Sequence, residues 1–141
     1  MRYFLAAVLF LFTFSSKAEE INIGNKAVYE ITIPKTTEEK EQGLMFIKEL
    51  PKNQGMLFDV RGHPYAAMWM KNTYIPLDML FIDCDFTITD IHKNAIPLSL
   101  DKISTAQPFC YVLEINGGQS DNKELSIGDK ITFSSPKEQV E

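Results

Sequence analysis

Short apolar runs separated by turn residues dominate the chain from Gly55 onward, and Gly, Asn, Asp and Pro stand between them. Runs of this length with such separators are typical of antiparallel β-structure. The predicted strands are Met56 to Val60, Ala66 to Met70, Met79 to Ile82, Phe86 to Ile91, Phe109 to Ile115 and Lys130 to Phe133. The pattern therefore predicts a small antiparallel barrel or a folded sandwich.

One strand and one helix precede these runs. Ala27 to Ile33 mixes β-branched and aromatic residues with polar ones, and Pro34 ends the strand because proline has no N–H to donate. Thr36 can cap a helix, and Glu39, three residues later, can complete a capping box. The helix is short because Gly43 interrupts it. We thus expect a mainly β (α+β) fold with one short N-terminal helix.

The segment from Met1 to Ala18 has the three parts of a secretory signal peptide. Arg2 is the basic start, an apolar run follows from Tyr3 to Phe14, and Ser16 and Ala18 are small residues that suit cleavage. The run is too short to cross a membrane, which takes about 20 apolar residues in a helix. We therefore predict an exported, soluble protein, periplasmic in a two-membrane bacterium and secreted otherwise, without a transmembrane anchor. An uncleaved N-terminal tether is the alternative.

The chain has 141 residues, and removal of a signal peptide leaves enough for one domain. We expect an N-terminal strand region at 19–35, which forms one domain with a β-rich part at 36–133, and a flexible tail at 134–141. The 14 basic and 19 acidic residues give a formal net charge of −5. Because nucleic acids and anionic membranes require a concentrated basic face, this balance argues against both as partners.

Only two cysteines occur, Cys84 and Cys110, and each lies in or beside an apolar, strand-like run. Export would bring both into a compartment where thiols tend to be oxidised. Neighbouring strands could place them within bridging distance, but two buried free thiols that act as small hydrophobic groups fit the sequence as well. The sequence leaves both states open.

The block from Trp69 to Asp78 runs from an apolar stretch through a polar turn and back to an apolar stretch. With several shorter segments, it resembles the family called domain of unknown function 192, which contains small and often exported proteins of bacteria and archaea. The shorter segments are Gly43-Leu44-Met45, Gly55-Met56-Leu57-Phe58, Phe81-Ile82-Asp83, Val112-Leu113-Glu114 and Gly128-Asp129. The resemblance covers Thr36 to Phe133 and implies a compact, strand-rich single domain, but no reaction, cofactor or substrate. Ile47 departs from it, because the family favours arginine after Gly-Leu-Met-Phe.

The same block contains the ingredients of a small polar pocket. Trp69 offers an aromatic wall, Lys71 a positive charge, Asn72 both donors and an acceptor, and Asp78 a carboxylate. In the strand that ends at Ile115, alternation puts Glu114 on a partly apolar face, where a cation such as Lys71 could be its partner. We predict that Trp69, Lys71, Asn72, Asp78 and Glu114 converge on one ligand-binding cleft. Alternatively, Asn72 shapes the turn, Trp69 packs in the core and Asp78 ties down a neighbouring loop.

Sulfur and imidazole groups allow a second kind of site. Met68 and Met70 form a Met-x-Met pair with His63 upstream, and exported proteins that carry Cu(I) use such ligands. Two methionines on one face of a strand are also how core methionines are spaced. We take core filling as the main interpretation and expect no metal and no cofactor.

Catalytic signatures are missing from the sequence. The two histidines, His63 and His92, lack a zinc-like spacing, and no nucleophile elbow, phosphate loop or dinucleotide fingerprint is present. We therefore predict a binding or accessory domain for a small molecule or an envelope protein. The alternatives are a small hydrolase or lyase that uses Lys71 with Asp78 or Glu114, and a structural partner of an envelope protein.

Overall fold

The computed structural model describes residues 19–63 and 65–134. The predicted signal peptide, Met1 to Ala18, lies outside the described residues, as do residues 135–141 of the predicted tail. Ser134, which the sequence assigns to that tail, is the last residue of a strand. Across 19–63 and 65–134, no helix has the length and apolar character needed to pass through a membrane.

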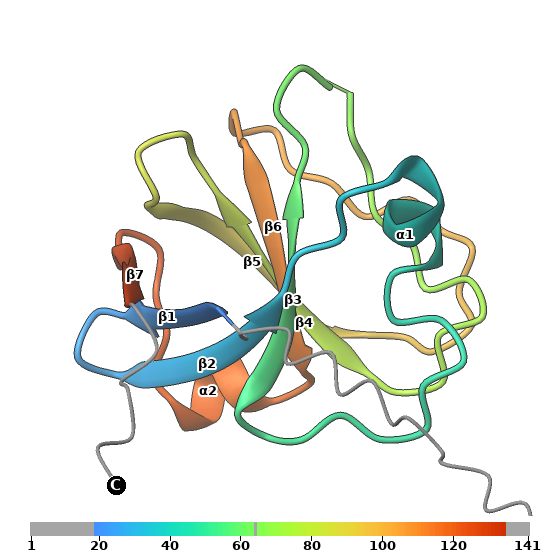
Figure 1. The fold of residues 1–141 in the computed structure, drawn as a ribbon, viewed down its shortest axis with the longest axis horizontal. Coiled ribbons are helices and arrows are strands. Elements are labelled where there is room, and N and C mark those ends of the chain that lie inside the picture. Colours follow the sequence, from blue (N-terminus) through green and yellow to red (C-terminus); the bar gives the residue numbers. More distant parts are fainter. Residues whose placement is uncertain (1–18, 64, 135–141) are drawn as a thin grey trace, which may run out of the picture.

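Seven strands form one curled sheet (Figure 1). The strands are β1 (Glu19–Ile23), β2 (Ala27–Thr32), β3 (Gln54–Asp59), β4 (Leu77–Ile82), β5 (Ile88–Ala95), β6 (Tyr111–Asn116) and β7 (Ile131–Ser134). Their order across the sheet is β5-β4-β6-β3-β2-β1-β7. Neighbours are antiparallel except β2 and β3, which are parallel, so the expectation of a purely antiparallel sheet is wrong at this pair. The reason is the long crossover between β2 and β3, which returns the chain to its starting end before β3 begins.

The two ends of the sheet meet. Thr87, just before β5, and Lys130, just before β7, form an isolated bridge. Around it, Ile131 N–H donates to Phe86 O at 2.8 Å, and Ile88 N–H donates to Asp129 O at 2.9 Å. These bonds satisfy backbone groups that an open edge would expose. The fold is mainly β and barrel-like, as the sequence predicts.

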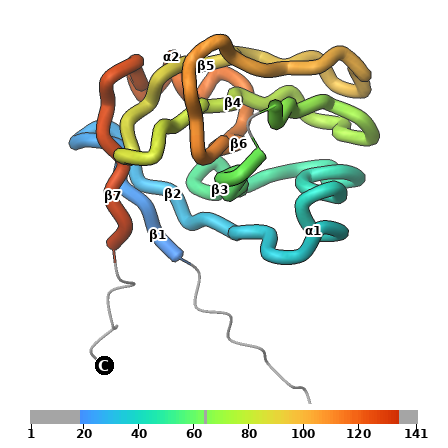
Figure 2. Tube along the Cα trace, turned by 90° about the horizontal axis from the view of Figure 1, so that it is seen from above, coloured from blue at the N-terminus to red at the C-terminus, as the bar shows by residue number. Residues whose placement is uncertain are grey.

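Two short helices connect the strands. Helix α1 (Thr37–Gln42) begins after Thr36, and the Thr36 and Glu39 side chains form the reciprocal bonds of a capping box. It ends at Gly43, whose φ of 48° suits glycine and where a Cβ would lie 3.1 Å from Phe58 Cζ. Helix α2 (Gln119–Asn122) was not predicted. In both Figure 1 and Figure 2, α1 lies at the end of the molecule opposite β7.

Two predictions for individual strands are wrong. Ala66 to Met70 forms no strand, because Met68 makes a single bridge with Ile103 and the segment otherwise covers the sheet. The strand expected from Phe109 begins only at Tyr111. If the strand extended back to Phe109, alternation would place Phe109 on the face of Leu113 and Cys110 on the face of Val112. Instead, Phe109 packs with Val112 and Cys110 packs with Leu113. Strand β1 was not predicted, since its sequence follows directly on the predicted signal peptide.

Each face of the sheet carries a hydrophobic core. The first core lies on the face that includes Leu113 and Ile115, and its other members are Ile21, Ile23, Tyr29, Ile31, Leu57, Leu80, Ile82, Ile88, Cys110, Tyr111, Leu125 and Ile131. The second core lies on the opposite face and consists of Leu44, Phe58, Met70, Leu77, Met79, Phe81, Ala95, Ile103 and Val112. Strand β4 contributes to both cores, and all six of its residues are buried.

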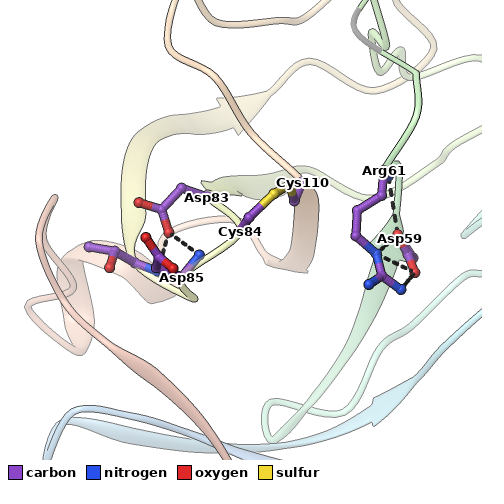
Figure 3. Close-up of a disulfide and its surroundings, with 7 residues drawn as sticks. Asp59, Arg61, Asp83, Cys84, Asp85 and Cys110 are labelled. Atoms are coloured by element: carbon purple, nitrogen blue, oxygen red, sulfur yellow. Dashed lines mark hydrogen bonds and ion pairs between the residues drawn. A yellow bond between two sulfur atoms is a disulfide. The ribbon is translucent and has the colours of Figure 1, made fainter.

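A disulfide joins Cys84, in the turn after β4, to Cys110, just before β6 (Figure 3). Their Cα atoms are 5.1 Å apart, within the range that a bridge requires. Beside it, the Asp83 carboxylate accepts hydrogen bonds from the backbone N–H groups of Asp85 and Thr87 and so closes the β4–β5 turn. The bridge fixes the long connection between β5 and β6 at its C-terminal end.

Candidate functional site

A cleft of about 930 Å³ lies over the second-core face of the sheet. One wall is α1 with the residues that follow it, and the other is the loop that carries the Trp69-to-Asn72 part of the predicted site. Its lining includes Lys40, Leu44, Met45, Phe46, Phe58, His63, Met68, Trp69, Lys71, Asn72 and Glu114. The cleft thus brings together four of the five predicted ligand-binding residues, namely Trp69, Lys71, Asn72 and Glu114.

Glu114 lies at the sheet side of this cleft. In the sheet register it stands opposite Met56 of β3 and opposite Met79 of β4, and residues paired in this way share a face. The Met79 side chain is fully buried, and Glu114 itself is only 4% exposed. At Gly55, a Cβ would lie 2.8 Å from Glu114 O, so the absence of a side chain there lets β3 approach β6. Glu114 therefore shares its face of the sheet with two methionines on the neighbouring strands.

Burial raises the pKa of the Glu114 carboxyl to about 8, and no charge or hydrogen bond offsets this effect. The ion pairs in the described part of the chain, Lys26–Asp129, Arg61–Asp59 and Lys93–Asp121, do not include it. The expected partner, Lys71, makes no such pair with it. Glu114 is a carboxyl group that lines a cleft, holds its proton at neutral pH and has no counterion among residues 19–63 and 65–134.

The mouth of the cleft carries aromatic and basic groups. Trp69 is 45% exposed, so the alternative in which it packs in the core is wrong. The Lys71 ammonium nitrogen lies 5.0 Å from the centre of the Trp69 ring, in a cation–π contact. On the other wall, Lys40 donates to Asp59 O at 3.0 Å. Both cations therefore already have partners on the protein.

Two residues with left-handed backbone join the walls. Phe46 and Asn72 have φ values of 67° and 51°, and Phe46 N–H donates to Asn72 O at 2.8 Å. The Asn72 amide also contacts the Met45 sulfur at 4.0 Å. Non-glycine residues adopt this conformation at a cost, and such strain clusters at functional sites. Asn72 thus both shapes its turn and fixes one wall against the other.

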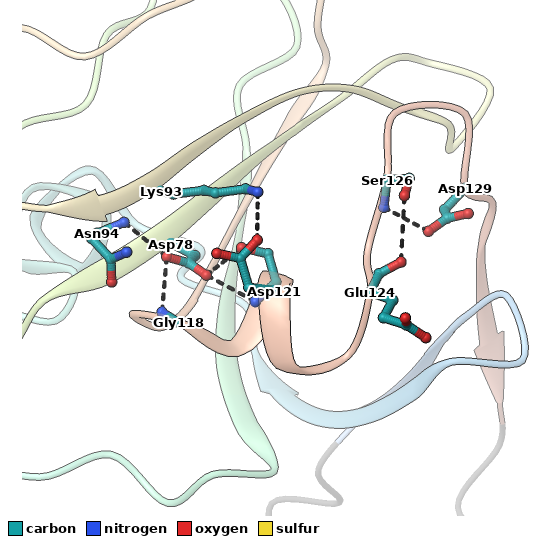
Figure 4. Close-up of polar contacts among 9 residues, drawn as sticks. Asp78, Lys93, Asn94, Gly118, Asp121, Glu124, Ser126 and Asp129 are labelled. Carbon is teal, nitrogen blue, oxygen red and sulfur yellow. Dashed lines mark hydrogen bonds and ion pairs between the residues drawn. The ribbon is translucent and has the colours of Figure 1, made fainter.

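Asp78 does not belong to the cleft, which corrects the five-residue prediction. It pairs with Ile115 in the sheet register, and Glu114 points to the other face. Its carboxylate accepts hydrogen bonds from the backbone N–H groups of Asn94, Gly118 and Ser120, at 2.8, 3.1 and 2.9 Å, and from the Ser120 hydroxyl (Figure 4). Asp78 therefore ties the start of α2 and the end of β5 to β4, and it forms no catalytic pair with Lys71 in the cleft.

Tyr29, on the first-core face, adds a buried hydroxyl to the polar groups around Asp78. Burial, with the Asp78 charge as a second cause, raises the pKa of the Tyr29 hydroxyl to about 12. That hydroxyl donates to Gln119 Oε1 at 3.2 Å. The polar groups around Asp78 are thus partnered within the protein, as expected of a structural network.

Of the three residues of the copper hypothesis, His63 and Met68 line the cleft, while Met70 is fully buried in the second core. Met68 also packs against that core, in agreement with core filling. Within 19–63 and 65–134, no group of three or more histidine, cysteine, aspartate or glutamate side chains is placed to hold a metal ion.

The sequence reasoning missed the α1 wall of the cleft. Leu44, Met45, Phe46 and Phe58 line it, as does Lys40. The repeated apolar residues after Gly43 were a signal for this wall, but only the tertiary fold brings them opposite Trp69. Ile47, the departure from the family pattern, packs against the second core.

A profile of the family described as "Uncharacterized ACR" (DUF192) matches residues 19–133. Two solved structures are similar over most of their length. A protein of unknown function from Novosphingobium aromaticivorans DSM 12444 has 35% identity and a TM-score of 0.74, and the match covers 80% of this chain and 83% of that one. A candidate transcription regulator from Sinorhizobium meliloti 1021 has 38% identity and a TM-score of 0.72, with 82% and 92% covered. The comparison with curated proteins found no match.

Proposed function

Because the chain belongs to the DUF192 family, whose description assigns no activity, we propose its function from its own residues: it is an exported domain whose cleft binds a small, partly apolar molecule. Glu114 carries this proposal. Its side chain is 4% exposed and opens onto the cleft, since no fully buried side-chain oxygen in the described part of the chain lacks a partner. A ligand in the cleft can therefore supply the partner that this carboxyl needs. The cleft volume, about 930 Å³, falls within the range of small-molecule sites.

The lining of the cleft agrees with such a ligand. Leu44, Phe46, Phe58 and Trp69 offer apolar and aromatic surface, and most of the charged lining residues other than Glu114 are exposed. Ligand sites commonly combine apolar walls with a small number of polar groups that fix orientation. The net charge of −5 and the lack of a basic cluster in the sequence favour a small molecule over nucleic acid as the ligand.

Export is supported by the features of Met1 to Ala18 and by the Cys84–Cys110 disulfide, since such bridges persist in oxidising compartments. Mass spectrometry of the protein from a bacterial host tests this part of the proposal. We expect a mature chain that begins at Glu19, found outside the cytoplasm and without free thiols. A full-length chain retained in the cytoplasm would contradict export.

Binding can be read from Trp69, which is the only tryptophan of the chain and lines the cleft. Titration with 1-hexanol, an uncharged and partly apolar probe, should change the intrinsic fluorescence with saturation. Replacing Phe46 by alanine removes apolar wall and should weaken binding about fivefold, an effect of roughly 1 kcal/mol. The matched control is Tyr65→Ala, because Tyr65 is 95% exposed and does not line the cleft. Equal affinities in both variants, or no saturable change, would refute a ligand site here.

A further inference from the structure

The charge arrangement inside the cleft points to the class of ligand, an inference that rests on the proposed function. We infer that the cleft holds an organic ammonium ion, with its cationic head against the Glu114 carboxylate and its apolar body between Phe58 and Trp69. Glu114 is the one acidic group of the lining that is buried. The other titratable lining groups, Lys35, Glu38, Lys40, Glu41, His63 and Lys71, lie nearer to solvent.

The protein supplies no cation of its own to Glu114. Lys40 is directed to the Asp59 carbonyl and Lys71 to the Trp69 ring. No ion pair that includes Glu114 occurs in the described part of the chain. Breaking a buried ion pair by removal of one partner is costly because a lone charge remains. An ionised Glu114 would be such a lone charge, and a ligand cation would supply the complementary half of the pair.

The groups next to Glu114 suit an ammonium ion with an apolar body. Met56 and Met79 flank the carboxyl across the two neighbouring strands, and thioethers are soft and polarisable. Trp69 at the mouth already holds one cation against its ring, which shows that its face accepts positive charge. A plain alcohol would meet the neutral carboxyl and gain no charge pairing, and an anionic head would gain none either, because it would repel Glu114 if that group ionised.

Binding of the cation is coupled to loss of a proton. Burial alone keeps the pKa of Glu114 high, so the free protein carries a neutral carboxyl at pH 7. When the ammonium ion enters with its own charge intact, the Glu114 carboxyl releases its proton to the buffer and the two opposite charges pair. No bond to carbon forms or breaks, and the net charge of the cleft is unchanged.

Three probes with one chain length separate the outcomes: n-hexylammonium, 1-hexanol and hexanoate, each titrated by calorimetry at pH 7 in phosphate and in Tris. We expect hexylammonium to bind at least ten times more tightly than the other two, with close to one proton released, as the difference between buffers reports. In Glu114→Gln, the preference and the proton release should both be lost while hexanol binding persists. Glu30→Gln, at an exposed residue of β2 outside the cleft, is the control and should retain both.

Three other results would each refute a particular part of the inference. If hexanol or hexanoate binds as tightly as hexylammonium, the ammonium inference is wrong while a small-molecule cleft stands. If hexylammonium binds without proton release, or Glu114→Gln keeps the preference, Glu114 is not the partner. If none of the three probes binds, both the inference and the proposed function fail. Should Glu114→Gln not fold, the proton count of the wild-type protein still decides.

Discussion

Asp78 and Glu114 are two buried carboxylates on neighbouring strands of one sheet, but they face opposite sides and have opposite surroundings. Asp78 is fully buried and accepts hydrogen bonds from three backbone N–H groups and one hydroxyl. Glu114 is 4% exposed, faces Met56 and Met79, and has a pKa raised by burial alone. The Asp78 carboxylate thus has hydrogen-bond donors within the protein, whereas the Glu114 carboxyl faces the cleft.

The difference separates a structural polar group from a candidate functional one. Donors around Asp78 keep its charge compatible with burial, so it can hold α2 and β5 in place without a ligand. The cleft around Glu114 has apolar walls, and its cations Lys40 and Lys71 contact the Asp59 carbonyl and the Trp69 ring. Neither of them offsets the cost of burying a charge on Glu114. A buried carboxyl of this kind with a perturbed pKa, in a cleft, marks a functional-site candidate.

The largest expected effect is at Asp78. Asp78→Ala would leave the buried N–H group of Ser120 and the part-buried N–H groups of Asn94 and Gly118 without their acceptor, and we expect a loss of about 3–5 kcal/mol in the free energy of unfolding. Urea denaturation of both proteins measures it. The control is Asp121→Asn, because Asp121 forms only an exposed ion pair with Lys93 and should change stability little. A loss at Asp78 no larger than that of the control would show that its contacts are not structural.

The next effect is the pH dependence at Glu114. Its pKa is near 4.5 in the unfolded chain and about 8 in the fold, so the folded state retains the proton between these values. Stability that comes from this proton is complete below pH 4.5 and is lost as the pH rises through 8, at about 1.4 kcal/mol per pH unit within the window. Denaturation curves at several pH values should show this slope in the wild-type protein and lose it in Glu114→Gln.

The control for this slope is Glu30→Gln on β2, where the side chain is exposed. It should retain the pH dependence of the wild-type protein. If Glu114→Gln also retains it, the Glu114 carboxyl is solvated or partnered in solution, and the contrast with Asp78 disappears.

The smallest effect is at Tyr29, on the Asp78 side. Tyr29→Phe removes the hydroxyl that donates to Gln119 and should cost about 1 kcal/mol in the free energy of unfolding. It should leave 1-hexanol binding unchanged, because Tyr29 packs in the first core and the cleft lies over the other face. Denaturation and Trp69 fluorescence check the two statements. Weaker binding of the probe would mean that the two faces are not independent.

Local signals in the sequence were reliable where one short segment decides its own structure. Thr36 and Glu39 predict the capping box because both partners lie within one turn. The alternation of Leu113, Glu114 and Ile115 predicts which of them share a face, because side chains alternate along any strand. The apolar run from Ala66 to Met70 misled, since a segment that covers a sheet can be as apolar as a strand.

One part of the candidate site follows from closeness along the chain, and another part depends on how the strands pair. That Trp69, Lys71 and Asn72 lie together follows from their closeness in sequence. That Glu114 joins them and Asp78 does not depends on the register of β4 against β6, in which Asp78 pairs with Ile115. A shift of one residue would exchange the faces, and no local pattern specifies that register.

The sequence by itself determined the β-rich class, the capped helix, the acidic balance and the residues able to carry chemistry, because each follows from composition or from neighbours along the chain. The tertiary structure decided the parallel pairing of β2 with β3, the Cys84–Cys110 bridge, and the placing of α1 opposite Trp69 over Glu114. These features join residues far apart in the sequence. Asp78 and Glu114 become buried only when the sheet has curled and both of its faces are covered. The raised pKa of Glu114 and the hydrogen bonds of Asp78 follow from that burial.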